Sequence, residues 1–271
     1  MISVLQLGTQ DYATALKLQQ TLVDLRKSNQ IGDVLLFLEH PPVITLGRNA
    51  HSANILATPE LLVQRGVEVL ECDRGGDVTF HGPGQLVGYP IFDLRAFTMP
   101  DGQRKTLGAI EFVRKMEEAL IRTCADFRIP ATRIPKLTGV WTSSTTADVE
   151  PAKIAAIGIH ISRAVTSHGF AVNVNTDLSF FDLIIPCGLT AKPVTSIQQE
   201  LGKPVSLDLV AESITRNFGH VFSRQILWLE SLDSLLGKDS PGNDSDSPVG
   251  VPARPPSNLR KLHGDDETSW A

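Results

Sequence analysis

One long amphipathic helix between two groups of short apolar segments constrains the fold of this chain more than any other feature. Apolar residues recur at helical spacing through Thr106–Phe127, so this segment presents one apolar stripe that must pack against a partner surface. The stripe consists of Leu107, Ile110, Val113, Met116, Leu120, Cys124 and Phe127. Strand-like segments occur on both sides of the helix without regular alternation. This order predicts an α+β fold with one mixed sheet, not a repeated βαβ unit.

The strand-like segments are short, apolar and bounded by turn residues. They are Val34–Leu38, Val43–Leu46, Val67–Cys72, Leu86–Phe92, Gly139–Trp141, Lys153–Ser162, Phe170–Asn175 and Ile226–Leu229. Three further helices are predicted from capping residues and apolar spacing. They run from Thr9 or Asp11 to about Lys27, from Thr58-Pro59 to a stop at Gly66, and over Ser206–Val221.

The last part of the chain differs in composition from the rest. Residues 237–271 are polar, rich in proline and nearly free of large apolar side chains. Such a segment buries too little apolar surface to offset the entropy lost on ordering. We therefore predict one folded domain over residues 1–236 and a disordered tail over 237–271.

Composition excludes several classes of protein. The chain of 271 residues is 42% hydrophobic and 20% charged with a net charge of −5, which is ordinary for a soluble globular protein and argues against nucleic acid as the main partner. Its apolar runs are too short to span a bilayer, and the N-terminus carries no targeting pattern, so we expect a cytoplasmic protein. The three cysteines show no C-x-x-C spacing and the histidines no H-x-x-x-H spacing. Neither a disulfide framework nor a metal site is expected.

Cys187 is the strongest candidate for chemistry. It lies between Pro186 and Gly188, where a stiff, turning backbone presents a side chain at the end of an element. The alternative is a small buried hydrophobic residue, which is the expectation for Cys124 on the helical stripe.

Lys153 is a second candidate, at the start of a predicted strand. Alone, a lysine there is usually a solvated edge residue. Beside Cys187, its ammonium group would stabilise the nucleophilic thiolate, or a desolvated lysine would accept the thiol proton. The sequence leaves both roles open.

The run Arg74–Gln85 contains four glycines, a pattern suited to a backbone that approaches a ligand closely and offers N–H groups to it. It matches no nucleotide-binding motif, and a turn-rich loop is the alternative. His168, just before a predicted strand, is either a site residue or a loop histidine hydrogen-bonded to the backbone. His40-Pro41-Pro42 is interpreted as a structural turn beside the site.

Taken in order, these motifs resemble those of the lipoate-protein octanoyltransferases of the biotin/lipoate protein ligase superfamily. The matching segments are His40-Pro41-Pro42 with Thr45 and Gly47, residues 74–85, Gly139–Trp141, and residues 153–159, 168–178 and 184–188. Each is weak alone, but the ordered set over about residues 1–230 is highly specific. The segment Thr142–Ala152 is longer than the family pattern.

The resemblance implies a biotin/lipoate-ligase-like catalytic domain over residues 1–236, with a mixed sheet flanked by helices. It implies transfer of an octanoyl group from octanoyl-acyl carrier protein to a lysine of apo lipoyl domains, in the E2 subunits of 2-oxoacid dehydrogenases and in the glycine cleavage H protein. No cofactor or metal is implied. Cys187 would carry the acyl thioester, and Lys153 would lower its pKa. The implied substrate-binding residues are Arg74, Gly75, Gly76, Asp77, Val78, Thr79, Phe80, His81, Ala156, Ile157, Gly158, Gly169, Phe170 and Ala171.

Three alternatives remain at the level of sequence. An ATP-dependent lipoate or biotin ligase would share the fold but need no cysteine nucleophile. A hydrolase would use the same thiol to release octanoate to water. A non-catalytic module would only bind acyl carriers or lipoyl domains, and the presence of both Cys187 and Lys153 argues against it.

Overall fold

The computed structural model describes residues 1–98, 104–143, 150–185 and 192–237. Cys187 lies outside these described residues. So do most of the long segment before Lys153 and the predicted tail from residue 238 onward.

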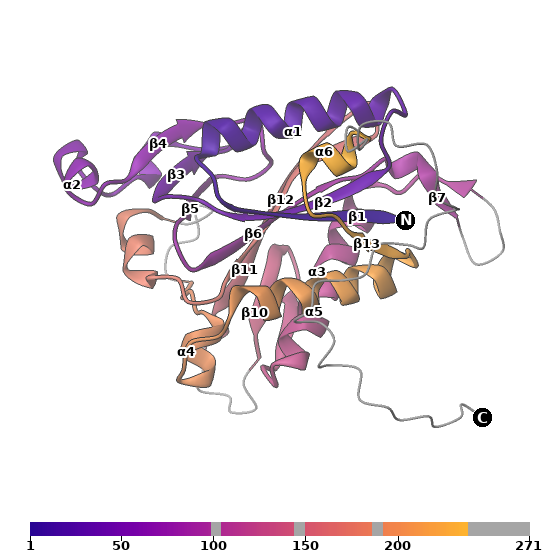
Figure 1. Ribbon diagram of the computed structural model, residues 1–271. Helices are drawn as coiled ribbons and strands as arrows, with labels where there is room; N and C mark the ends of the chain where they lie inside the picture. Colours follow the sequence, from indigo (N-terminus) through magenta and orange to yellow (C-terminus); the bar gives the residue numbers. More distant parts are fainter. Residues whose placement is uncertain (99–103, 144–149, 186–191, 238–271) are drawn as a thin grey trace.

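An eight-stranded mixed sheet forms the centre of the molecule (Figure 1). In sheet order its strands are β13 (Ile226–Trp228), β1 (Ile2–Thr9), β2 (Asp33–Glu39), β6 (Gln85–Ile91), β12 (Val165–Asn173), β11 (Lys153–Ser162), β10 (Leu137–Thr142) and β9 (Ala131–Ile134). Strand β1 pairs in parallel with β13 and with β2. The remaining neighbours are antiparallel.

Helices cover both faces of this sheet. Helix α1 (Tyr12–Lys27) lies on one face, and α3 (Ala109–Asp126) and α5 (Leu207–Phe222) lie on the other (Figure 1). The side chain of Asp11 caps α1 by accepting a hydrogen bond from the N–H of Thr14, as its position predicted. On α3, Met116, Leu120 and Cys124 of the predicted stripe are at most 2% exposed, whereas Ile110 is 78% exposed, so the predicted stripe is confirmed except at Ile110.

Two small sheets accompany the large one, so the expectation of a single mixed sheet was incomplete. The first has the order β4 (Glu68–Glu71), β3 (Val43–Leu46) and β5 (Val78–His81), and the second pairs β7 (Phe97–Thr98) with β8 (Arg104–Lys105). The short helices are α2 (Pro59–Gln64), α4 (Ile197–Leu201) and α6 (Leu232–Leu235), with 3₁₀ turns at Ser52–Asn54, Leu94–Ala96 and Leu178–Leu183.

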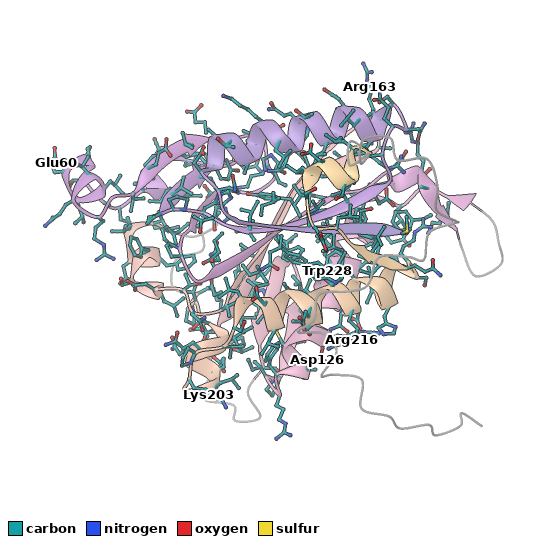
Figure 2. All side chains as sticks on the ribbon, viewed as in Figure 1. Glu60, Asp126, Arg163, Lys203, Arg216 and Trp228 are labelled. Atoms are coloured by element: carbon teal, nitrogen blue, oxygen red, sulfur yellow. The ribbon has the colours of Figure 1, made fainter. Side chains whose placement is uncertain are left out.

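Side chains fill the space between the sheet and both helical layers (Figure 2). One apolar cluster joins α3 and α5 to the sheet, and another joins α1 to the opposite face. Within the described residues, no helix combines the length and the apolar character needed to cross a membrane.

Candidate functional site

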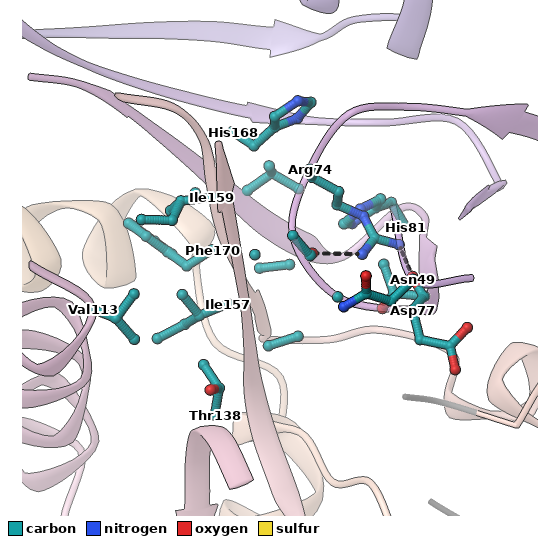
Figure 3. A pocket seen from close by; sticks show the side chains of 18 of the residues that line it. Asn49, Arg74, Asp77, His81, Val113, Thr138, Ile157, Ile159, His168 and Phe170 are labelled. Carbon is teal, nitrogen blue, oxygen red and sulfur yellow. Dashed lines mark hydrogen bonds between the residues drawn. The ribbon is translucent and has the colours of Figure 1, made fainter. Parts of the chain in front are cut away.

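A cavity of about 570 Å³ lies where the glycine-rich loop, β5, β11 and β12 meet. Figure 3 shows residues from distant parts of the chain around it, from Asn49 to Phe170. Helix α1 contributes Tyr12, and α3 contributes Val113. The cavity is therefore built at the junction of the small sheet and the large one.

The apolar end of the cavity enters a gap between β10 and β11. These strands pair at Val140 and Ala155, and the pairing ends there on the side toward the start of β10. Gly139 and Ala156 would pair next, and Thr138 and Ile157 after them, but these pairs are not formed, and Thr138, Ala156 and Ile157 line the cavity. Ile157 and Val113 lie together at this end (Figure 3). The gap therefore gives an apolar slot that leads from the polar loop toward α3.

The glycine-rich loop lies directly against the backbone of β11. The N–H of Gly75 donates to the carbonyl of Ile159 at 2.9 Å. A Cβ atom on Gly158 would lie 2.6 Å from the carbonyl oxygen of Gly75. A side chain at position 158 would therefore push the loop away from the strand, so this approach requires glycine.

Arg74 holds the shape of this loop. Its guanidinium donates to the carbonyl of Thr45 at 2.7 Å, to that of Asp77 at 2.6 Å and to that of Gly75 at 3.1 Å. It also donates to the hydroxyl of Thr45, and the residue is 7% exposed. Arg74 was predicted to bind substrate. Most of the hydrogen bonds that its guanidinium donates go to backbone carbonyls, so this side chain shapes the cavity wall.

Strand β5 places alternate residues on opposite sides. Thr79 and His81 line the cavity. Val78 and Phe80, also predicted to bind substrate, are 0% and 1% exposed in a separate apolar cluster, where Phe80 stacks on Phe180 at 4.7 Å. The two-residue period of a strand explains this division, which a prediction for the whole segment overlooked. The other described candidates all line the cavity: Arg74, Gly75, Gly76, Asp77, Thr79, His81, Lys153, Ala156, Ile157, Gly158, Gly169, Phe170 and Ala171.

Lys153 is not the solvated edge residue that its position alone would suggest. It is 8% exposed and lines the cavity, with Nζ 4.7 Å from the ring centroid of the buried Trp141. Its backbone N–H donates to Pro193 at 2.8 Å, and its carbonyl accepts from Thr195 at 2.9 Å. The chain that follows residues 186–191 is thus paired with the backbone of Lys153.

The chain that precedes residues 186–191 is also held. The N–H of Ile185 donates to the carbonyl of Asn54 at 2.7 Å, and Ile184 forms a bridge with Ile55. Cys187 follows Ile185 by two residues and itself lies outside the described residues.

His168 lies within β12 and not in a loop before a strand. Its Nε2 donates to Asp73 at 2.7 Å, and its backbone N–H donates to the side chain of Gln19 at 2.7 Å. Its φ of 55° is in the left-handed region. Burial lowers the pKa of this histidine, although the carboxylate of Asp73 acts in the opposite direction. His168 therefore fastens Asp73, next to the glycine-rich loop, to β12.

Several cavity residues were missed from the sequence, among them Tyr12, Tyr89, Asn49 and His51. His40 lies behind this wall. Its Nδ1 donates to the carbonyl of Gln10 and its Nε2 accepts from the hydroxyl of Tyr89, each at 2.7 Å. No local pattern marks Tyr12 or Tyr89, because each lies at an ordinary core position of a helix or a strand.

Burial keeps this cluster uncharged. It lowers the pKa of His40 to about 4 and that of His81 to about 3, and it raises the pKa of Tyr12 and of Tyr89. At neutral pH these four side chains are therefore uncharged hydrogen-bonding groups.

The two depressed histidine pKa values predict a pH-dependent stability. In the unfolded chain His40 and His81 protonate near pH 6.5, whereas in the fold they stay neutral to about pH 4 or below. The unfolded state then binds more protons. The free energy of unfolding should therefore fall by about 1.4 kcal/mol per pH unit for each histidine as the pH drops below 6.5.

Urea unfolding between pH 6.5 and 5 measures how the free energy of unfolding changes with pH. Most carboxyl groups titrate below this range. A flat profile in this range would contradict the predicted burial of neutral histidines.

Comparison with known proteins identifies the family. The profile of the lipoyl protein ligase A/B catalytic domain matches residues 11–219. The chain belongs to the lipoyl protein ligase A/B family. Two curated members with the name octanoyltransferase are similar over most of its length. That of Koribacter versatilis is 61% identical over 267 residues, 98% of both chains, and that of Acidobacterium capsulatum is 56% identical over 87% of this chain and 96% of its own.

Solved structures of lipoate protein ligases share the fold. A bipartite lipoate protein ligase from Thermoplasma acidophilum has a TM-score of 0.62 at 19% identity and covers 88% of this chain and 91% of its own. A lipoate-protein ligase A with bound ATP has a TM-score of 0.62 at 18% identity, with coverage of 88% and 94%. The predicted ligase-like fold and the family resemblance are confirmed.

Proposed function

We propose that this chain transfers an octanoyl group from octanoyl-acyl carrier protein to a lysine of apo lipoyl domains, through a thioester on Cys187. Identity of 61% to a named octanoyltransferase over 98% of both chains supports octanoyl transfer, and with it an acyltransferase that acts in protein lipoylation. The acceptors proposed are lipoyl domains of 2-oxoacid dehydrogenase E2 subunits and the glycine cleavage H protein. Residues 1–236 would form the catalytic domain.

One observation carries the mechanism. The buried side chain of Lys153 lines a cavity with an apolar slot, and the backbone of Lys153 pairs with the chain that follows the segment of Cys187. A cation beside a thiol favours the thiolate, which is the nucleophilic form. The apolar slot near Val113 and Ile157 suits a hydrocarbon chain, since burial of each CH₂ contributes about 0.8 kcal/mol.

The reaction divides into two balanced steps. First, the thiolate of Cys187 attacks the thioester carbonyl, the bond from that carbon to the carrier's sulfur breaks, and the carrier's thiol leaves with the proton that Cys187 lost. Next, the amine of the acceptor lysine attacks the new thioester. An amide forms, the carbon–sulfur bond breaks, and the amine's proton restores the thiol of Cys187. The first step exchanges one thioester for another, and amide formation drives the second.

The alternatives predict different products. A ligase would require ATP and form an acyl-adenylate, but three curated relatives at 54–61% identity carry the name octanoyltransferase. A hydrolase would release octanoate in the absence of any acceptor.

Intact-mass spectrometry tests the proposal. We expect octanoyl-acyl carrier protein to add one octanoyl group to the chain without ATP, hydroxylamine to remove it, and an apo lipoyl domain to accept it. Cys187→Ser should form no such hydroxylamine-sensitive adduct, whereas Cys72→Ser should form it normally. Normal turnover by Cys187→Ser would overturn the mechanism.

A further inference from the structure

A chain of buried hydrogen bonds fixes the protonation of His81. Gln85 is 2% exposed, and its Nε2 donates to the carbonyl of Phe80 at 3.2 Å. A backbone carbonyl can only accept, so this contact settles which end of the amide is nitrogen. The oxygen of Gln85 then faces Nδ1 of His81 at 2.7 Å. Because that oxygen can only accept, Nδ1 of His81 carries the hydrogen.

The second ring nitrogen of His81 is therefore an acceptor. A neutral imidazole with hydrogen on Nδ1 has a lone pair on Nε2. The ring lines the cavity and stacks on Tyr12, with centroids 6.1 Å apart and planes 15° apart. Burial lowers the pKa of His81 to about 3, so the ring remains neutral during turnover at ordinary pH.

The same hydrogen bonds continue to Lys153. Nε2 of Gln85 also donates to the side-chain oxygen of Asn173 at 2.9 Å, and Nδ2 of Asn173 donates to the carbonyl of Thr195 at 2.9 Å. The N–H of Thr195 in turn donates to the carbonyl of Lys153 at 2.9 Å. Gln85, Asn173 and Thr195 are at most 4% exposed. This chain of hydrogen bonds thus links the side chain of His81 to the backbone of Lys153.

Of the two substrates, only the acceptor lysine can donate a hydrogen bond to this nitrogen at the reacting centre. An octanoyl thioester has no N–H or O–H near the reacting carbon, whereas the attacking lysine amine carries N–H bonds. A hydrogen bond from one amine N–H to Nε2 would fix the orientation of the amine and of its lone pair. Fixed orientation of this kind contributes strongly to rate.

We propose that His81 accepts a hydrogen bond from the acceptor amine in the second step, and that Gln85 and Asn173 are positioning residues that hold His81 in the required tautomer. This inference rests on the two-step function proposed above. It assigns His81 to the acceptor lysine and not to the acyl donor. His81 takes up no proton from the amine, because the amine's proton goes to the departing sulfur of Cys187.

Two half-reactions test the proposal separately. Acylation is followed by the mass of the chain after mixing with octanoyl-acyl carrier protein, and transfer by adding an apo lipoyl domain to the isolated octanoyl form. His81→Leu should slow transfer roughly 10- to 100-fold and leave acylation nearly unchanged. His81→Gln, which offers an amide oxygen near the position of Nε2, should recover part of the loss. Equal loss in both half-reactions, or unchanged transfer, would overturn the proposal.

The tautomer gives a readout that a merely structural role would not change. In the ¹⁵N spectrum of the wild-type chain, His81 should show a protonated Nδ1 and an unprotonated Nε2. Gln85→Leu should allow both tautomers and slow transfer, whereas the exposed Gln20→Leu should do neither. Hydrogen on Nε2 in the wild-type chain would overturn the proposal even if the variants do not fold.

The two half-reactions also distinguish failure of the proposed two-step function from failure of the proposed role of His81. If no octanoyl adduct forms on the wild-type chain, the two-step mechanism is wrong and His81 loses its proposed substrate. If the adduct forms and transfer ignores His81, only the present inference is wrong.

Discussion

Replacement of Lys153 by methionine should slow acylation by octanoyl-acyl carrier protein about 10- to 1,000-fold at pH 7. A cation within a few ångströms lowers the pKa of a thiol by about one to three units, and the rate follows the thiolate fraction. Methionine keeps an unbranched chain against Trp141 but removes the charge. The profile of acylation rate against pH should therefore move upward, toward the ordinary thiol pKa of about 8.5.

Two variants frame this result. Lys203→Met removes a lysine that is exposed (Figure 2) and should leave the profile unchanged. Lys153→Arg keeps the charge in a wider group and should retain the pH profile better than it retains the rate. If Lys153→Met acylates with the wild-type pH profile, Lys153 does not act on the pKa of Cys187.

Strong periodic patterns predicted most of the fold. Strands β3 and β11 follow from the sequence to the residue and helix α3 to within three residues, because each carries apolar residues in a clear stripe or run. Strand β1 was missed because its sequence has no preceding turn, and its parallel pairing with β2 and β13 is a long-range property. Strand β5 was hidden inside the glycine-rich run, where turn residues dominate the local pattern.

The site was predicted as a set of segments, and the structure resolves these into individual side chains. Sequence alone does not show that Arg74 turns to the carbonyls of Thr45 and Asp77, because Thr45 lies on β3, 29 positions before Arg74, and the bend at Asp77 folds the loop back on Arg74. It equally does not connect His81 to Lys153, which are 72 positions apart and linked through Gln85 and Asn173. The chemistry of the candidate residues is local, but their arrangement depends on sheet register.

A single methyl group at Gly169 should destabilise the fold by about 3 kcal/mol or more. Gly169 lies in β12 beside β6, and a Cβ atom there would overlap the carbonyl oxygen of Gly88 and lie 2.5 Å from Cδ of Pro90. Both obstacles belong to the backbone or to a proline ring, so no side-chain rotation relieves them. The strands would have to separate at the point where Phe170 and Ala171 line the cavity.

Thermal unfolding of Gly169→Ala measures this effect, with an expected fall in the melting temperature of roughly 6–12 °C. Gly32→Ala is the matched control, because its Cβ would meet no atom within 4 Å and its φ lies outside the left-handed region. That variant should unfold within about 0.5 kcal/mol of the wild-type chain. A Gly169→Ala variant that melts with the wild type would show that β6 and β12 can separate without cost. In that case the close approach of the two backbones would not be the reason that position 169 requires glycine. It would also not be the reason that Phe170 lies over the cavity.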